Sequence, residues 1–231
     1  MLSRTKRLPL LEFVVLMALM TSILALSIDC MLPAFNDMTG DLRLNNPKDI
    51  QLIVSFMFLG LGIGKLFFGP FADSYGRRPV VFIGFGTYIV GCLISYFSQN
   101  LSVMLLGRVL QGFGVAGPSN ITLVLVRDLY KGREMARIMS YIMAVFILVP
   151  VLAPGLGLAI IAISNWRIIF LGFLTTSILI LTWFFLRQEE TLLMENRKKT
   201  SLTYFFSTIL QVCKIKITLL YTIIIGLTSG A

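Results

Sequence analysis

Two ionisable side chains lie well inside long apolar runs of this chain. Asp29 falls near the end of the run 8–35, and Arg108 falls within the run 101–126. A charged residue near the centre of a membrane helix costs about 2.5–3.5 kcal/mol on insertion scales, so its presence indicates function by default. If the first run crosses outward and the fourth inward, both residues lie about 9–10 Å from the same face. That shared depth predicts an ion pair, or a proton-binding carboxylate beside a fixed positive charge. The alternatives are a purely structural pair and side chains that extend to the interface.

A second group of chemically capable residues forms the stretch GPFADSYGRRPV between two apolar runs. Gly76 permits a chain reversal, and two adjacent arginines favour the cytoplasmic side of a membrane. We name this stretch the latch loop, and its candidate residues are Gly69, Asp73, Gly76, Arg77 and Arg78. Glu12, at the start of the first run, is as readily explained by simple solvation.

Glycine and proline gather in other runs. Two prolines four residues apart in LVPVLAPGLGLAI remove two backbone donors and predict a bend. The bend is a pivot or a static kink, and its candidate residues are Pro150, Pro154, Gly155 and Gly157. The glycines of runs 52–71 and 101–126 predict close helix packing.

The residue types also exclude several chemistries. The chain has no histidine, which removes Ser-His and Cys-His catalysis and histidine-based metal sites. Three cysteines at scattered positions do not form a disulfide framework. We therefore expect no enzyme activity, no metal and no cofactor.

The elements that must position these residues are membrane helices. Of the 231 residues, 57% are hydrophobic and only 13% are charged, whereas soluble domains are about 25% charged. About 20 apolar residues cross the hydrocarbon, and lipid requires such spans to be helical. Six runs qualify: Leu8–Phe35, Leu52–Phe71, Val80–Phe97, Leu101–Val126, Ile138–Ile163 and Ile168–Leu186.

The basic residues set the expected orientation. Fifteen of the 20 lysines and arginines fall on the side of the N-terminus and three on the other side. This bias predicts a cytoplasmic N-terminus. It also explains the net charge of +9 by membrane topology, so we expect no nucleic-acid partner.

Three segments are expected along the chain. Residues 1–190 form a six-helix bundle, 191–216 a basic cytoplasmic linker, and 217–231 an incomplete seventh membrane helix. The last apolar run would reach about 22 Å, short of a bilayer's hydrocarbon core of about 30 Å. We therefore expect a chain cut off inside its seventh helix.

The ordered motifs resemble the N-terminal half of a major facilitator superfamily transporter. The latch loop is similar to the superfamily's signature between spans two and three, LLGRVLQGFGVA to its span-four motif, and VPVLAPGLG to its span-five antiporter motif. IDCMLPAF, VRDLYKGREMARIMS and NWRIIF resemble the bicyclomycin and chloramphenicol resistance (Bcr/CflA) branch of drug:proton antiporters. Ser74 and Leu158 depart from the motifs, where a basic residue and a second glycine are usual.

The resemblance implies an all-α fold with two inverted three-helix repeats in this half and a partner half of the same size. It implies proton-coupled export of small amphipathic drugs across the bacterial inner membrane. Asp29 and Arg108 would couple protons to substrate, and the latch loop would pair with the other half. The alternatives are an inactive remnant of such a transporter and, with little support, an intramembrane enzyme.

Overall fold

The computed structural model describes residues 8–44 and 46–192, and these form helices without strands. Six helices in this part of the chain are long and apolar enough to cross a membrane, which confirms the six predicted spans. The helices are α1 (Leu10–Asp29), α2 (Phe35–Asp41), α3 (Leu52–Tyr75), α4 (Arg77–Tyr96), α5 (Leu101–Leu129), α6 (Gly132–Ile163) and α7 (Arg167–Arg187), with 3-10 turns η1 (Leu32–Ala34) and η2 (Pro47–Gln51).

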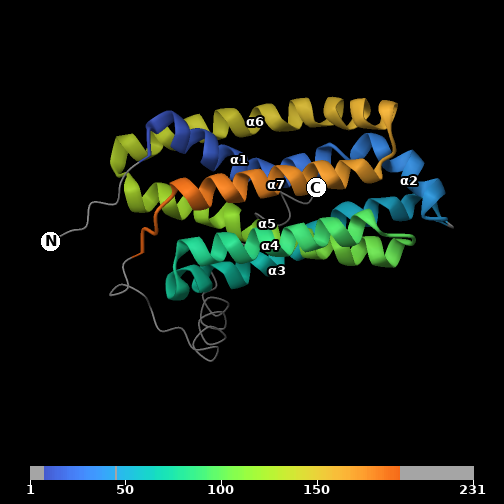
Figure 1. Cartoon of the computed structure of the whole chain (residues 1–231), viewed down its shortest axis with the longest axis horizontal. Helices are drawn as coiled ribbons and strands as arrows, with labels where there is room; N and C mark the ends of the chain where they lie inside the picture. The colour runs from blue at the N-terminus through green and yellow to red at the C-terminus, as the bar shows by residue number, and fades with distance from the viewer. Residues whose placement is uncertain (1–7, 45, 193–231) are drawn as a thin grey trace, which may run out of the picture.

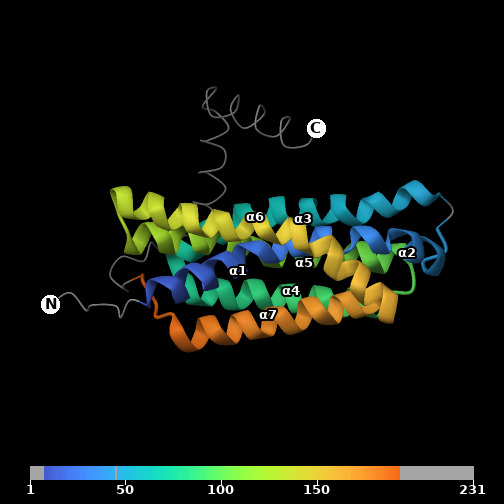
Figure 2. The same ribbon diagram turned by 90° about the horizontal axis from the view of Figure 1, so that it is seen from above.

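The long helices lie side by side along one axis (Figure 1). Seen from above, α3 and α6 occupy one face, α1 and α5 lie in the middle, and α4 and α7 occupy the opposite face (Figure 2). The first repeat comprises α1, α3 and α4, and the second comprises α5, α6 and α7. The short α2 lies at the end of the bundle away from the N-terminus (Figure 1).

The first predicted span is not one continuous helix. α1 ends at Asp29, and a short 3-10 turn precedes α2. Pro33 accounts for the break, because it has no N–H to donate to the carbonyl of Asp29 and its ring would clash with that carbonyl. The first membrane-spanning segment extends from Leu10 to Asp41, and what is corrected is the expectation of one continuous helix, since α1 stops at Asp29.

The latch loop is also shorter than expected. α3 runs to Tyr75 and α4 begins at Arg77, so Gly76 is the only residue between the two helices. Gly76 has φ 108°, a conformation that favours glycine over residues with a Cβ. The reversal at Gly76 is confirmed, but most of the predicted loop is helix.

Glycines bring α5 into backbone contact with its neighbours. A Cβ on Gly60 would overlap the backbone of Val109, and one on Gly112 would overlap the backbone of Met57. Gly84 and Gly114 make the equivalent approach between α4 and α5. The predicted packing role is confirmed for Gly60, Gly112 and Gly114, the contact of Gly84 was not predicted, and α5 forms the centre of the bundle. Gly62, in contrast, has open space beside it.

α6 packs much less closely against the rest of the bundle than α5 does. Only four of its 32 residues are buried: Ile138, Ile142, Ala153 and Gly157. Its main neighbour is α1. Most of its surface is therefore free to contact lipid or another protein.

The predicted basic linker and partial seventh helix fall almost entirely outside the described residues. Of the segment 191–216, the structure describes only Thr191 and Leu192.

Candidate functional site

Arg108 lies at the centre of a polar network within the bundle. Its side chain is 0% exposed. Nε donates to the carbonyl of Ile53 at 3.2 Å, and Nη2 donates to the carbonyl of Ser27 at 3.1 Å. Nη1 donates to Oε1 of Gln111 at 2.6 Å, and Nη2 also lies 2.7 Å from Sδ of Met57. The guanidinium thus joins α1, α3 and α5, and its complete burial excludes an extension to the interface.

The end of α1 supplies one of these acceptors. The N–H of Met31 bonds to Ile28 three residues back instead of to Ser27 four residues back. The carbonyl of Ser27 is left for Arg108. Carbonyls at a helix C-terminus carry partial negative charge, which stabilises a nearby cation. The break at Pro33 therefore helps create the arginine site.

Two further contacts extend the network to α4. Gln111 donates from Nε2 to Oγ of Ser95 at 3.0 Å. The hydroxyls of Ser27 and Tyr88 also share a hydrogen bond. Tyr88 and Gln111 are both buried. Tyr88 bonds to the hydroxyl of Ser27, whose carbonyl accepts from Arg108, and Gln111 bonds to Arg108 directly. Sequence reasoning missed these neutral residues, although Gln111 lies one turn after Arg108 in the same motif.

Asp29 and Arg108 do not form the predicted ion pair. They do share a depth, since Arg108 bonds to Ser27 two residues before Asp29. Within the described residues, however, no ion pair or hydrogen bond joins the Asp29 side chain to a partner, and its exposure is intermediate. Arg108 bonds to two backbone carbonyls, Gln111 and Met57, and not to the Asp29 carboxylate.

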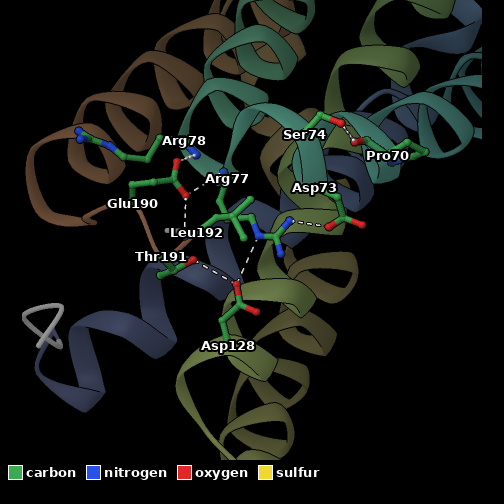
Figure 3. A network of polar contacts seen from close by, with 9 residues as sticks. All are labelled: Pro70, Asp73, Ser74, Arg77, Arg78, Asp128, Glu190, Thr191 and Leu192. Carbon is green, nitrogen blue, oxygen red and sulfur yellow. Dashed lines mark hydrogen bonds and ion pairs between the residues drawn. The ribbon is translucent and has the colours of Figure 1, made fainter. Parts of the chain in front are cut away.

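A second network of polar contacts is centred on Arg77, the first residue of α4 at the end of the bundle (Figure 3). Nη1 of Arg77 lies 2.9 Å from Oδ1 of Asp73, one turn earlier, and Nε lies 3.3 Å from Oδ2 of Asp128 in the last turn of α5. The Arg77 side chain is only 8% exposed. The resemblance implied pairs with the other transporter half, but these pairs of Arg77 lie within this chain.

Glu190 and Thr191, just beyond α7, complete the end network (Figure 3). The carboxylate of Glu190 accepts from the backbone N–H of Arg77 at 2.9 Å and from that of Arg78 at 3.0 Å. These are the first N–H groups of α4, where a helix has unsatisfied donors and a positive dipole end. The hydroxyl of Thr191 donates to Asp128 at 3.1 Å. Sequence reasoning missed both residues, because Glu190 lies 113 positions after Arg77, the first residue of the helix it caps.

The other latch-loop residues have separate roles. Arg78 donates from Nη2 to the backbone carbonyl of Phe185 at 2.6 Å. Its guanidinium also lies over the aromatic ring of Phe185, 4.4 Å from the ring centroid. Ser74 donates to the carbonyl of Pro70 at 3.0 Å (Figure 3). Gly69 is half-buried, and a Cβ there would have open space. Gly69 therefore has no packing requirement for glycine in this structure.

The bend residues lie within a continuous helix, α6, whose second half curves toward α7 (Figure 2). Pro150 and Pro154 are half-buried, and Gly155 has open space beside it. Gly157 packs so closely on Cys30 that a Cβ would overlap its carbonyl. Leu158 is 59% exposed, so the departure at this position does not obstruct the close contact.

Two further charged contacts join α1 and α2 to the two ends of α7. Glu12 accepts from Arg187 at 2.6 and 2.7 Å and from Nε1 of Trp183 at 3.1 Å. At the opposite end, Asp41 accepts from Trp166 at 2.9 Å and from Arg167 at 2.8 Å. Glu12 is therefore paired and not simply solvated. In the part of the chain that the structure describes, no group of three potential metal-ligating residues is found.

The chain is similar in sequence to known transporters. An uncharacterized transporter of Rickettsia bellii is 33% identical over 78% of this chain and 44% of its own length. A bicyclomycin resistance protein homolog of Haemophilus influenzae is 30% identical over 80% of this chain and 46% of its own length. The chain thus spans about half the length of the curated relatives it matches.

The fold agrees with these sequence matches. The structure of the proton:xylose symporter XylE superposes on 89% of this chain and 52% of that one, with a TM-score of 0.67 and 14% identity. The sequence model described as Major Facilitator Superfamily matches residues 14–231. This chain is a multi-pass membrane protein with the helical fold of a transporter half, and it belongs to the major facilitator superfamily.

Proposed function

We propose that this chain forms the N-terminal half of a proton-coupled exporter of small amphipathic drugs in the bacterial inner membrane. The observation that carries the proposal is that Asp29, a carboxylate without a partner among the described residues, lies two residues after Ser27, whose carbonyl binds the fully buried cation Arg108. A carboxylate takes up and releases protons, whereas an arginine stays protonated. The name of the Haemophilus influenzae relative supports drug export.

The proposed cycle divides these roles between the two charges. Asp29 binds a proton from the outer side and releases it inward, while the outgoing drug moves in the opposite direction. Arg108 keeps its positive charge at all stages and holds the end of α1, where Asp29 lies, through the carbonyl of Ser27. The bend in α6 near Pro150 and Pro154 acts as a pivot between the two access states.

The transport cavity requires two halves, because substrate sites in such folds lie at the interface between repeats. We expect this chain alone to give no drug resistance. The test of the proposed transport function therefore co-expresses this chain with the second half of the Haemophilus influenzae relative as a separate polypeptide. Drug-induced proton release from inverted membrane vesicles is the measurement.

Asp29→Asn should abolish that proton release, because asparagine has nearly the same size but does not titrate. Glu12→Gln is the matched control, since its carboxylate lies in a contact with Arg187 at the bundle end. Membrane abundance is measured in parallel. An Asp29→Asn protein of normal abundance that still exchanges protons for drug would refute the assignment, and no exchange by the original pair would favour the inactive alternative.

The same proposal includes a cytoplasmic N-terminus. Arg77, Arg78 and Arg187 lie at the end of the bundle where α1 begins, as the positive-inside rule expects of a cytoplasmic end. A cysteine placed at Asn100 or Asn165 should react with impermeant maleimide only from outside the cell. Reaction from the cytoplasm at either position would reverse the topology.

A further inference from the structure

A cavity of about 280 Å³ opens on the bundle between α3 and α6, with α1 and α5 behind it. Figure 2 shows α3 and α6 on the same face of the molecule, with α1 and α5 in the layer beneath. This cavity lies apart from both arginine networks, because its lining includes none of their arginines or carboxylates. It is lined by Thr21, Leu24, Lys65, Ser119, Asn120, Thr122, Leu123, Met139, Ile142, Met143 and Phe146.

Lys65 is exposed in this chain and carries the only formal charge among the lining residues. It lies ten residues before the end of α3, about 15 Å along the helix axis. Among the described residues, no carboxylate lies within ion-pair distance of its ammonium, and no hydrogen bond to it is found. A lysine within a membrane span is costly to insert, so an unpaired one in a cavity wall indicates a functional partner.

The remaining lining residues define the rest of a binding site. Ser119 and Asn120 supply a hydroxyl and an amide from neighbouring positions of α5, and the hydroxyl of Thr122 donates within α5 to the carbonyl of Pro118. Opposite them, α6 supplies methionine, isoleucine and phenylalanine side chains. Cavities that bind small molecules combine such apolar walls with a few polar groups that orient the ligand. Methionine side chains in particular adapt to ligands of different shapes.

We propose that this cavity binds an amphipathic molecule with an acidic group, and that Lys65 pairs with that group while α6 contacts the apolar part. The proposal rests on the proposed transport function, since it takes the cavity as part of the drug pathway, and it narrows the drugs to organic anions. The absence of an acidic residue from the lining gives a cationic ligand no charged partner. Lys65 is thus a specificity-determining residue.

The test compares two probes of matched size and opposite charge, 2-naphthylacetate and 2-naphthylethylammonium. Their binding to the 231-residue chain in nanodiscs of neutral phosphatidylcholine is measured by equilibrium dialysis, with empty nanodiscs subtracted. We expect the anion to bind at least about tenfold more tightly than the cation, a difference of about 1.4 kcal/mol. Lys65→Met should remove this preference, and Lys65→Arg should keep it. Lys48→Met, an exposed lysine in η2, is the control that should change nothing.

With the chain alone, three results would overturn the proposal. They are no binding of the anion above background, a preference for the cation, and an anion preference that survives Lys65→Met. The measurement is repeated with the complementary half bound. Loss of the preference there would show that Lys65 pairs with a group of the other half and not with a ligand.

The outcome is separable from that of the transport assay, because binding requires no proton gradient. Anion preference without proton exchange would refute the proposed export mechanism and leave the binding site standing. Proton exchange with drugs of either charge that does not depend on Lys65 would refute the proposed anion site and leave the proposed export mechanism standing.

Discussion

Among the described residues, two arginines are buried in this bundle, and their guanidinium groups take different kinds of hydrogen-bond acceptor. Arg108, in the middle of the bundle, is fully buried and bonds to two backbone carbonyls, a glutamine and a methionine sulfur. Arg77, at the end of the bundle, bonds to two carboxylates that are 48% and 31% exposed. One cation is held by neutral groups and the other by opposite charges.

The difference follows from the surroundings. Burying a second charge beside Arg108 would add its own desolvation cost, which the attraction between the pair does not always offset. Carbonyls at the end of α1 supply negative potential without that cost, because they are already fixed by the helix. At the water-exposed end, aspartates remain solvated on one side while they pair with Arg77. Position in the membrane therefore decides which partners an arginine takes.

The largest effect is expected from Arg108→Lys. Lysine keeps the charge but loses the planar fork, so at least one carbonyl or Gln111 loses its donor. We expect the free energy of unfolding to fall by about 3 kcal/mol, measured by thermal unfolding of the detergent-solubilised chain. Arg127→Lys, in the exposed last turn of α5, is the matched control and should unfold as the original does. Equal stability of the two variants would show that the planar guanidinium of Arg108 does not contribute to the stability of the bundle.

A smaller effect is expected from Gly157→Ala. The new methyl group would press on the carbonyl of Cys30 and displace the end of α1, where Arg108 finds its acceptor. We expect a loss of about 1–3 kcal/mol in the same unfolding measurement. Gly155→Ala, two residues earlier and beside open space, should be neutral or slightly stabilising because alanine favours helix. Similar losses for both variants would contradict the close contact between α6 and α1.

The smallest effect is expected from Glu190→Gln at the bundle end. The amide has one acceptor oxygen for the two N–H groups of α4, so one donor is left without its partner. We expect a loss of about 1 kcal/mol, and raising NaCl to about 0.5 M should shrink it because salt screens exposed charges. Glu134→Gln is the control, an exposed carboxylate in the first turn of α6. The same salt concentration should leave the Arg108→Lys loss unchanged, and a shared salt dependence would remove the distinction between the two networks.

The sequence was sufficient to predict the six spans, the reversal at Gly76 and the close packing through glycine. Each depends on a property of neighbouring residues: apolar length, a positive φ, or small residues at helical spacing. Asp29 and Arg108 were also correctly placed at one depth, because residue position along a helix converts directly into height. The ion pair, one of the arrangements that this depth allowed, is not found among the described residues, since depth does not specify which faces of two helices meet.

The identity of each partner was decided only by the tertiary structure. Ser27 and Ile53 contact Arg108 through backbone carbonyls, which every residue carries and no side-chain pattern reveals. Glu190 reaches the start of α4 because α7 packs against α4. Lys65 is an isolated charge in the sequence, and the cavity beside it exists only where four helices come together. Local chemistry along one chain determines which segments enter the membrane, whereas contacts between helices depend on the rotation of each helix about its own axis, which packing fixes.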